Sequence, residues 1–187
     1  MPRISAATVP EHRHQVHRRI FDAFADLMAQ ESYDAITMAR IAERAGLGRT
    51  AIYHHFPDKA AVVVGFASAE TEAYVAELEE RLASTPDPVL RMRYYIRHQL
   101  EAGHTFHMGL GVQLVGRLPD SSRRAIRAHV TAVEDVLRRI LAEGVESGTM
   151  TVPDPDTALA LVHACLTPRD LPSEQVESFV LRALGCP

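Results

Sequence analysis

The chain of 187 residues has few of the features that would place a protein outside the cell or in a membrane. Its two cysteines, Cys165 and Cys186, are too few for a disulfide framework. No apolar run approaches the roughly 20 residues that span a bilayer, and the first residues lack the apolar core of a signal peptide. We therefore expect a cytoplasmic protein with reduced thiols and no membrane partner.

The sequence patterns of several common enzyme classes are also missing. HExxH does not occur, and a phosphate loop ending in GKS or GKT is excluded because the only lysine, Lys59, follows Asp58. The glycines of GLGVQLVG, at 109–116, have the wrong spacing for a dinucleotide loop, and no strand pattern precedes them. We expect no enzyme activity and no cofactor, with a small helical enzyme as the least favoured alternative.

The composition is that of a globular protein whose charge is unevenly distributed. Apolar residues make up 47% and charged residues 24%, and the net charge is −4. Residues 1–60 carry a net charge of +1 together with five histidines, whereas residues 61–187 carry −5. This distribution permits DNA binding by the near-neutral segment 1–60 if its cations share one face, even though residues 61–187 are acidic.

The apolar residues recur with helical spacing along almost the whole chain. Val16, Ile20, Phe24 and Leu27 form one such stripe. The pattern predicts an all-α fold of about nine helices: 11–31, two short helices within 37–56, 57–84, 89–102 with Gly103 as its stop, 104–118, 120–147, 156–166 and 173–184.

The segment 36–62 carries the spacing of a helix-turn-helix. Such a motif needs a small residue where its two helices touch and a residue that tolerates positive φ at the turn. Ala42 is the small residue and Gly46 lies at the turn. The apolar residues that hold the second helix against the first are Ile41, Ala45, Leu47 and Ile52. The sequence therefore predicts a DNA-reading motif.

At this segment the chain resembles the tetracycline-repressor (TetR) family of one-component bacterial regulators. The resemblance is strongest in GLGRTAIYHHFPDK, residues 46–59, and weaker beyond about Val64; Gly48 departs from the family's frequent serine cap. It implies a flexible N-terminal arm at 1–10, a DNA-binding domain at 11–57, and a ligand-binding and dimerisation domain at 58–187. The expected function is a homodimeric repressor that binds a palindromic double-stranded DNA operator and is released by a small-molecule effector.

The outward residues of the predicted recognition helix are the DNA-binding candidates. Arg49 can hold the O6 and N7 atoms of guanine in a bidentate contact, while Tyr53 is expected on a phosphate, as its counterpart is in many relatives. His55 and Phe56 are expected to pack the recognition helix on the first helix. The full set of DNA-binding candidates is Thr37, Arg40, Arg49, Thr50, Tyr53, His54 and Lys59.

The body holds two further predicted sites. The apolar faces of its last two helices predict a dimer interface of Leu159, Val162, Leu166, Val176, Phe179 and Val180, unless these faces are buried within one chain. The effector-binding candidates are Met92, Tyr95, His98, Phe106, His107, Gln113, His129 and His163. One alternative is a metal-sensing regulator with a site at His98, His104 and His107. Others are a helix-turn-helix activator and a ligand-blind architectural factor.

Overall fold

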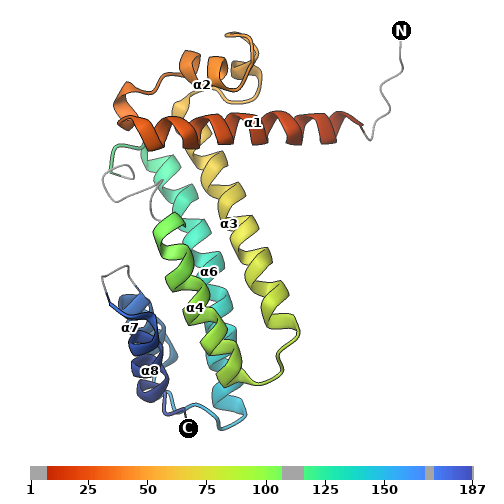
Figure 1. Cartoon of the computed structure of the whole chain (residues 1–187). Coiled ribbons are helices and arrows are strands. Elements are labelled where there is room, and N and C mark those ends of the chain that lie inside the picture. The colour runs from red at the N-terminus through yellow and green to blue at the C-terminus, as the bar shows by residue number, and fades with distance from the viewer. Residues whose placement is uncertain (1–7, 107–115, 167–170, 187) are drawn as a thin grey trace. The chain divides into compact units, whose positions relative to one another are not determined.

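A computed structural model describes residues 8–106, 116–166 and 171–186 of the chain, and in this part it is helical without strands, as Figure 1 shows. It contains seven α-helices and two 3-10 helices, so the predicted all-α fold is confirmed. The described residues form two compact units, 8–68 with 116–125, and 69–106 with 126–186. The first unit extends past the boundary expected at residue 57, because it includes the beginnings of two long helices.

The first unit is built on α1, Thr8–Gln30. The predicted stripe of Val16, Ile20, Phe24 and Leu27 is buried on one face of this helix. The short helices that follow are the 3-10 helix η1 (Tyr33–Ala35), α2 (Met38–Arg44) and the 3-10 helix η2 (Ile52–His54). Helix α2 packs across α1 (Figure 1). The unit is completed by the starts of α3 (Lys59–Ala83) and α6 (Asp120–Glu146).

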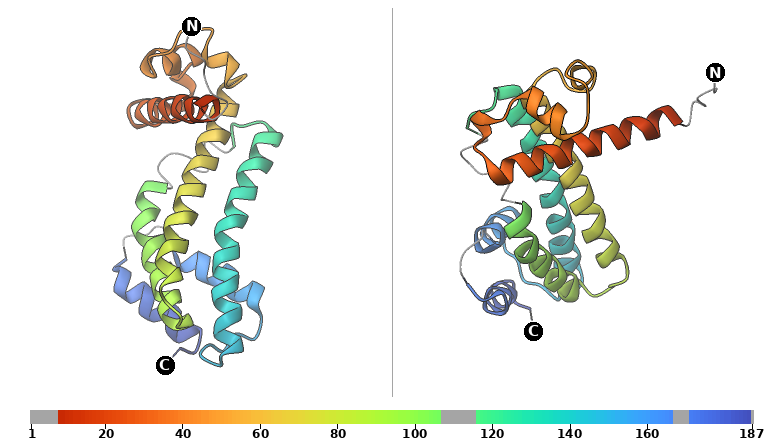
Figure 2. Two further views of the ribbon diagram at one scale, coloured as in Figure 1. Left: turned by 90° about the vertical axis from the view of Figure 1, so that its right-hand side faces the viewer. Right: turned by 45° about the horizontal axis from the view of Figure 1, so that its top comes forward.

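The second unit is a helical bundle. It comprises the later parts of α3 and α6 with α4 (Pro88–Phe106), α7 (Pro155–Leu166) and α8 (Ser173–Ala183). Within it α3, α4 and α6 run side by side, and α7 and α8 pack against α4 and each other (Figures 1 and 2). Tyr95, Ile96 and Leu137 are fully buried in its core. No helix in the described ranges is long and apolar enough to cross a membrane.

One predicted helix end is wrong. Helix α4 continues through Gly103 to Phe106, although Gly103 was expected to stop it. A glycine inside a helix costs only about 1 kcal/mol relative to alanine, so the packed face of α4 overrides it. A separate helix was predicted at 104–118. Its first residues, 104–106, belong to α4, and its last, 116–118, form a turn. Residues 107–115 lie outside the described ranges.

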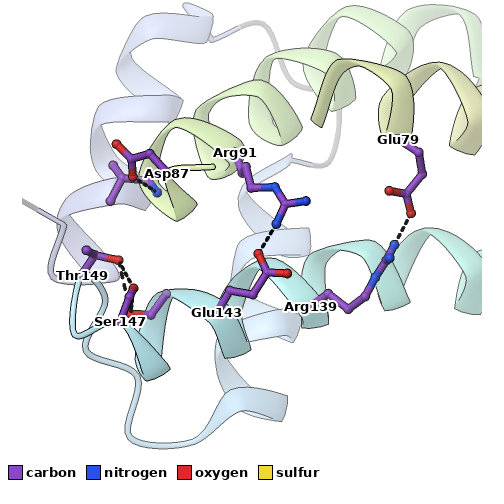
Figure 3. A network of polar contacts seen from close by, with 9 residues as sticks. Glu79, Asp87, Arg91, Arg139, Glu143, Ser147 and Thr149 are labelled. Carbon is purple, nitrogen blue, oxygen red and sulfur yellow. Dashed lines mark hydrogen bonds and ion pairs between the residues drawn. The ribbon is translucent and has the colours of Figure 1, made fainter. Parts of the chain in front are cut away.

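Ion pairs join the long helices of the second unit at its surface. Arg91 of α4 pairs with Glu143 of α6, and Arg139 of α6 pairs with Glu79 of α3, as Figure 3 shows. These side chains are partly exposed to solvent, and ion pairs of this kind contribute at most about 1 kcal/mol each. They therefore add little to the stability that burial of the bundle core provides.

A more buried carboxylate connects α8 to α4. Glu177 is 5% exposed, and its Oε1 accepts a hydrogen bond of 2.6 Å from Arg93 while Oε2 accepts one of 2.6 Å from Arg97. Burial tends to raise the pKa of Glu177, but the hydrogen bonds and charges of Arg97 and Arg93 outweigh it, and the pKa is lowered. The two arginines therefore hold the carboxylate ionised inside the bundle.

We predict that Glu177→Gln lowers the free energy of unfolding by about 2 kcal/mol, since it removes charge-assisted hydrogen bonds and keeps the shape. Because the native pKa is lowered, the difference from the parent chain should be complete above pH 4.5, the ordinary pKa of a glutamate, and shrink as the pH falls below it. Urea denaturation from pH 3 to 8 measures this. Glu174→Gln, an exposed neighbour on α8, is the control; equal effects of the two variants would contradict the prediction.

Candidate nucleic-acid interface

Helix α2 ends in the turn that the sequence predicted. Gly46 has φ +64°, a left-handed conformation that suits glycine, so this expectation is confirmed. Gly46 N–H donates to the Glu43 carbonyl at 3.1 Å and Leu47 N–H to the Ala42 carbonyl at 2.8 Å, which is the Schellman pattern of a helix C-terminus. The chain is thereby turned sharply after α2.

The second helical piece is shorter than a recognition helix is expected to be. Residues 49–51 form a turn and only Ile52–His54 is helical, as a 3-10 helix. Its backbone bonds are of the i to i−3 type, from Ala51 N–H to the Gly48 carbonyl and from His54 N–H to the Ala51 carbonyl. Gly48 has no side chain to accept a hydrogen bond from the following N–H groups, so the piece begins without a cap.

The outward residues of this piece are exposed, as a surface for DNA requires. Arg49, Thr50 and His54 are exposed, and Tyr53 keeps 53% of its surface accessible. In the part of the chain that the structure describes, Arg49 has no hydrogen bond or ion pair. Its guanidinium is therefore available to an external acceptor without loss of an internal contact.

Two other predicted contacts have partners within the unit. Thr37 is the N-cap of α2, and its hydroxyl oxygen accepts from Arg40 N–H at 3.3 Å. The guanidinium of Arg40 forms a bidentate pair with Glu31, which raises the pKa of Arg40. Arg44 next to it is paired with Asp26. A phosphate contact by Arg40 would thus have to compete with a carboxylate.

Lys59, at the first turn of α3, is bonded to the chain that leads into α2. Its ammonium donates to the carbonyls of Tyr33 at 2.6 Å and Ile36 at 2.7 Å, and it lies 3.9 Å from the centroid of the Tyr33 ring. Burial lowers the pKa of Lys59. An ammonium has three N–H donors, so one is left for a phosphate. Lys59 therefore has a structural role that its sequence position did not indicate.

Aromatic rings hold the exposed segment on α1, as expected for His55 and Phe56. The ring of Phe56 lies 4.8 Å from that of His17 and 5.6 Å from that of Phe21, and His55 meets His17 edge-on at 5.3 Å. Burial, followed by the charges of neighbouring histidines and Arg13, lowers the pKa of both His17 and His55. The two rings therefore favour the neutral form and serve as packing groups.

Of the predicted effector residues whose side chains are described, three lie in the core of the second unit and one, His163, is half-buried at its edge. Met92, Tyr95 and His98 are buried, and the Tyr95 hydroxyl bonds to His163 Nε2 at 3.1 Å and accepts from Gln99 at 3.0 Å. His98 stacks on Tyr74 with 4.5 Å between ring centroids. Phe106 ends α4 and His129 lies in α6, but their side chains, together with His107 and Gln113, are outside what the structure describes.

The predicted interface residues divide into two groups. Five of them pack in the core of this chain: Leu159, Val162, Leu166, Val176 and Val180. Phe179 is 57% exposed. It lines a groove of 580 Å³ between α7 and α8 together with Leu161, which is 62% exposed and was not among the predicted residues. Sequence periodicity found the apolar helices but could not tell their inner face from their outer one.

The metal alternative finds no support in the described part of the molecule. Among its residues no three His, Cys, Asp or Glu side chains come close enough to hold a metal ion. His98 stacks in the core, while His107 and the side chain of His104 lie outside the description. The proposed cluster of these three histidines therefore stays a prediction.

Comparison with known proteins places the chain among bacterial regulators. The family model described as bacterial regulatory proteins, tetR family, matches residues 20–65. The model described as the tetracyclin repressor-like C-terminal domain matches residues 112–170. An HTH-type transcriptional repressor of Mycobacterium tuberculosis is 34% identical over 76 residues, which are 41% of this chain and 38% of that protein. The chain thus matches well under half the length of this relative.

Two solved structures share the fold over nearly the whole chain. The TetR-family regulator PfmR of Thermus thermophilus is 25% identical with a TM-score of 0.67, over 90% of this chain and 98% of that one. FadR of Bacillus subtilis, solved in complex with stearoyl-CoA, is 19% identical with a TM-score of 0.71, over 89% and 88%. With matches in its N-terminal motif, its C-terminal segment and its fold, this chain belongs to the TetR family of transcriptional regulators.

Proposed function

We propose that the protein is a cytoplasmic homodimeric repressor that binds a palindromic DNA operator through residues 48–54 and is released by a small molecule. The observation that carries the DNA-binding part is the exposure of Arg49, Thr50, Tyr53 and His54 on one short segment. The segment is held on α1 by Phe56, whereas the guanidinium of Arg49 has no partner in the described chain. Such a surface offers donors to base edges and phosphates at no internal cost.

The dimer part of the proposal is supported by the outer face of α7 and α8. Leu161 and Phe179 leave more than half of their surfaces accessible beside a groove between these helices. A second copy related by a two-fold axis would pack the same face against this one. Leu161 and Phe179 of both copies would then be buried in the interface. Two copies are also what a palindrome needs, since its half-sites lie about 34–36 Å apart along the duplex.

The effector part of the proposal is supported by the polar groups in the core of the second unit. The buried Tyr95, which belongs to the same apolar cluster as Met92, is joined by hydrogen bonds to the half-buried Gln99 and His163. An apolar environment with a few fixed polar groups is what a small organic ligand requires. The solved FadR, which shares the fold, is in complex with stearoyl-CoA. A ligand that prefers one of two states by about 1–3 kcal/mol, a typical allosteric coupling, would weaken DNA binding by about 5- to 150-fold.

We predict that Arg49→Ala relaxes base preference at one position of each half-site, at a cost of about 1–3 kcal/mol for the preferred sequence. Duplexes selected from a randomised library by the parent chain provide the probe, and band shifts on all four bases at each position provide the measurement. Arg127→Ala, which removes an exposed arginine of α6, controls for charge alone. An equal loss on every sequence would refute base reading by Arg49.

We predict that Lys59→Met changes both the salt dependence of DNA binding and the free energy of unfolding. If the third N–H of the ammonium meets a phosphate, binding to every sequence weakens alike and the dependence of log K on log salt flattens by about one unit. The loss of donors to the Tyr33 and Ile36 carbonyls should also lower the free energy of unfolding by about 2 kcal/mol. An unchanged salt slope in a folded variant would rule out the phosphate contact.

Introducing a charge on the α7–α8 face should separate the copies. We predict that Leu161→Lys and Phe179→Lys each shift the protein from dimer to monomer at micromolar concentration in sedimentation equilibrium. Val145→Lys, at a 42% exposed apolar side chain of α6, should leave the dimer intact. A parent chain that sediments as a monomer, or two lysine variants that remain dimeric, would contradict this interface.

A further inference from the structure

An arginine of α1 is bonded to the turn that precedes the reading segment. Arg19 lies near the middle of α1, and its Nη2 donates to the carbonyls of Ala45 at 2.5 Å and Gly46 at 3.0 Å. These carbonyls follow the two that the Schellman turn already satisfies, those of Ala42 and Glu43. A cation at this place also interacts favourably with the negative C-terminal end of α2.

The identity of residue 46 is tied to this contact. Gly46 needs its positive φ, and a Cβ atom built on it would lie 2.9 Å from Arg19 Nη2. A side chain at this position would therefore strain the backbone and also displace the guanidinium. Gly46 thus allows both the turn and the approach of Arg19.

The residues between the turn and the buried Ile52 are mostly exposed, so few side-chain contacts fix their direction. Only two residues separate Gly46 from Arg49, and one of them, Gly48, has no atom within 4 Å of the position its Cβ would take. The aromatic contacts to α1 begin later, at His55 and Phe56. From Gly46 to the fully buried Ile52, the bonds donated by Arg19 are the side-chain hydrogen bonds that hold the backbone of the described chain.

We propose, on the basis of the DNA-reading function, that Arg19 is a positioning residue. Arg19 holds the turn at Ala45 and Gly46 in place, and the turn determines where Arg49 lies against a base pair. Arg19 itself does not touch DNA. The other arginines near α2, Arg40 and Arg44, are paired with carboxylates instead. Of the arginines in the described ranges, Arg19 is the one that donates to the backbone of the turn.

The test uses the full chain and a duplex selected by it from a randomised library. Arg19→Met should weaken binding to that duplex at least about tenfold, because the turn is released. Binding to a scrambled duplex should change less than about twofold, and the salt slope should stay the same, since no phosphate contact is lost. Arg18→Met, which removes an exposed charge one residue away, should leave all three unchanged.

Two further variants make the role specific. Arg19→Lys retains a donor and a charge, and should recover part of the lost preference. Gly46→Ala should lower selective binding by itself, and the double variant Arg19→Met, Gly46→Ala should lose clearly less than the product of the two single losses, since the clash with Arg19 is gone. Independent effects of the two changes would overturn the link between these residues.

Other outcomes also overturn the proposal. A salt slope that falls by about one unit, together with weaker binding to the scrambled duplex, would make Arg19 a phosphate contact. Loss of the helical circular dichroism of Arg19→Met would assign Arg19 to folding alone. If the parent chain selects no sequence from the library at low salt, the DNA-reading function itself fails. If it selects one and Arg19→Met binds it normally, only the positioning role fails.

Discussion

The proposed DNA-reading surface depends on packing against α1, because the helices that carry it are too short to be stable alone. Helix α2 has seven residues and η2 has three, whereas isolated helices below about 12–15 residues are marginal in water. The rings of Phe21 and Phe56, in contact with His17, supply the apolar part of this packing. Gly65 of α3 permits it, since a Cβ there would lie 2.8 Å from the Phe56 ring. The exposed segment is therefore a projection from a rigid support.

Some cationic side chains of the first unit are paired within the chain, whereas others are available to an external anion. Residues 1–60 have a net charge of only +1, which by itself gives little attraction for DNA. Within the unit, Arg40 pairs with Glu31, which follows α1, and Arg44 pairs with Asp26 of α1. Lys59 donates to backbone carbonyls. Among the described residues Arg49 forms no ion pair. The distribution of partners, more than the net charge, makes the segment suitable for an anionic surface.

Local patterns in the sequence predicted the fold and the turn well. The helical period located the long helices to within a few residues, and the spacing of Ala42 and Gly46 located the turn, because both signals depend on neighbours within a few positions. Contacts between distant residues have no such signal. Arg19 meets Gly46 across 27 positions and Lys59 meets Tyr33 across 26, so their roles emerged only from the structure.

The same limit explains the division of the predicted dimer residues. Val162 and Val180 lie on apolar helices, but a helix that packs on its own core and on a partner has two apolar faces. The spacing of apolar residues in the sequence shows both faces together and does not separate them. Only the packing of α7 and α8 on α4 shows that Val162 faces inward and Phe179 outward. The exposed pair at Leu161 and Phe179 is then the part of the pattern that the single chain leaves unexplained.

The core of the second unit shows how the proposed effector could gain its preference for one state. His98 is 5% exposed, and its Nε2 has no hydrogen-bond partner among the described residues. An unmet buried polar atom costs about 1–3 kcal/mol. A ligand that supplied the missing partner would recover that energy only in the state that admits it. This amount equals the coupling that typical allosteric proteins use, so one histidine in an apolar core is sufficient in energy to bias the balance between two states.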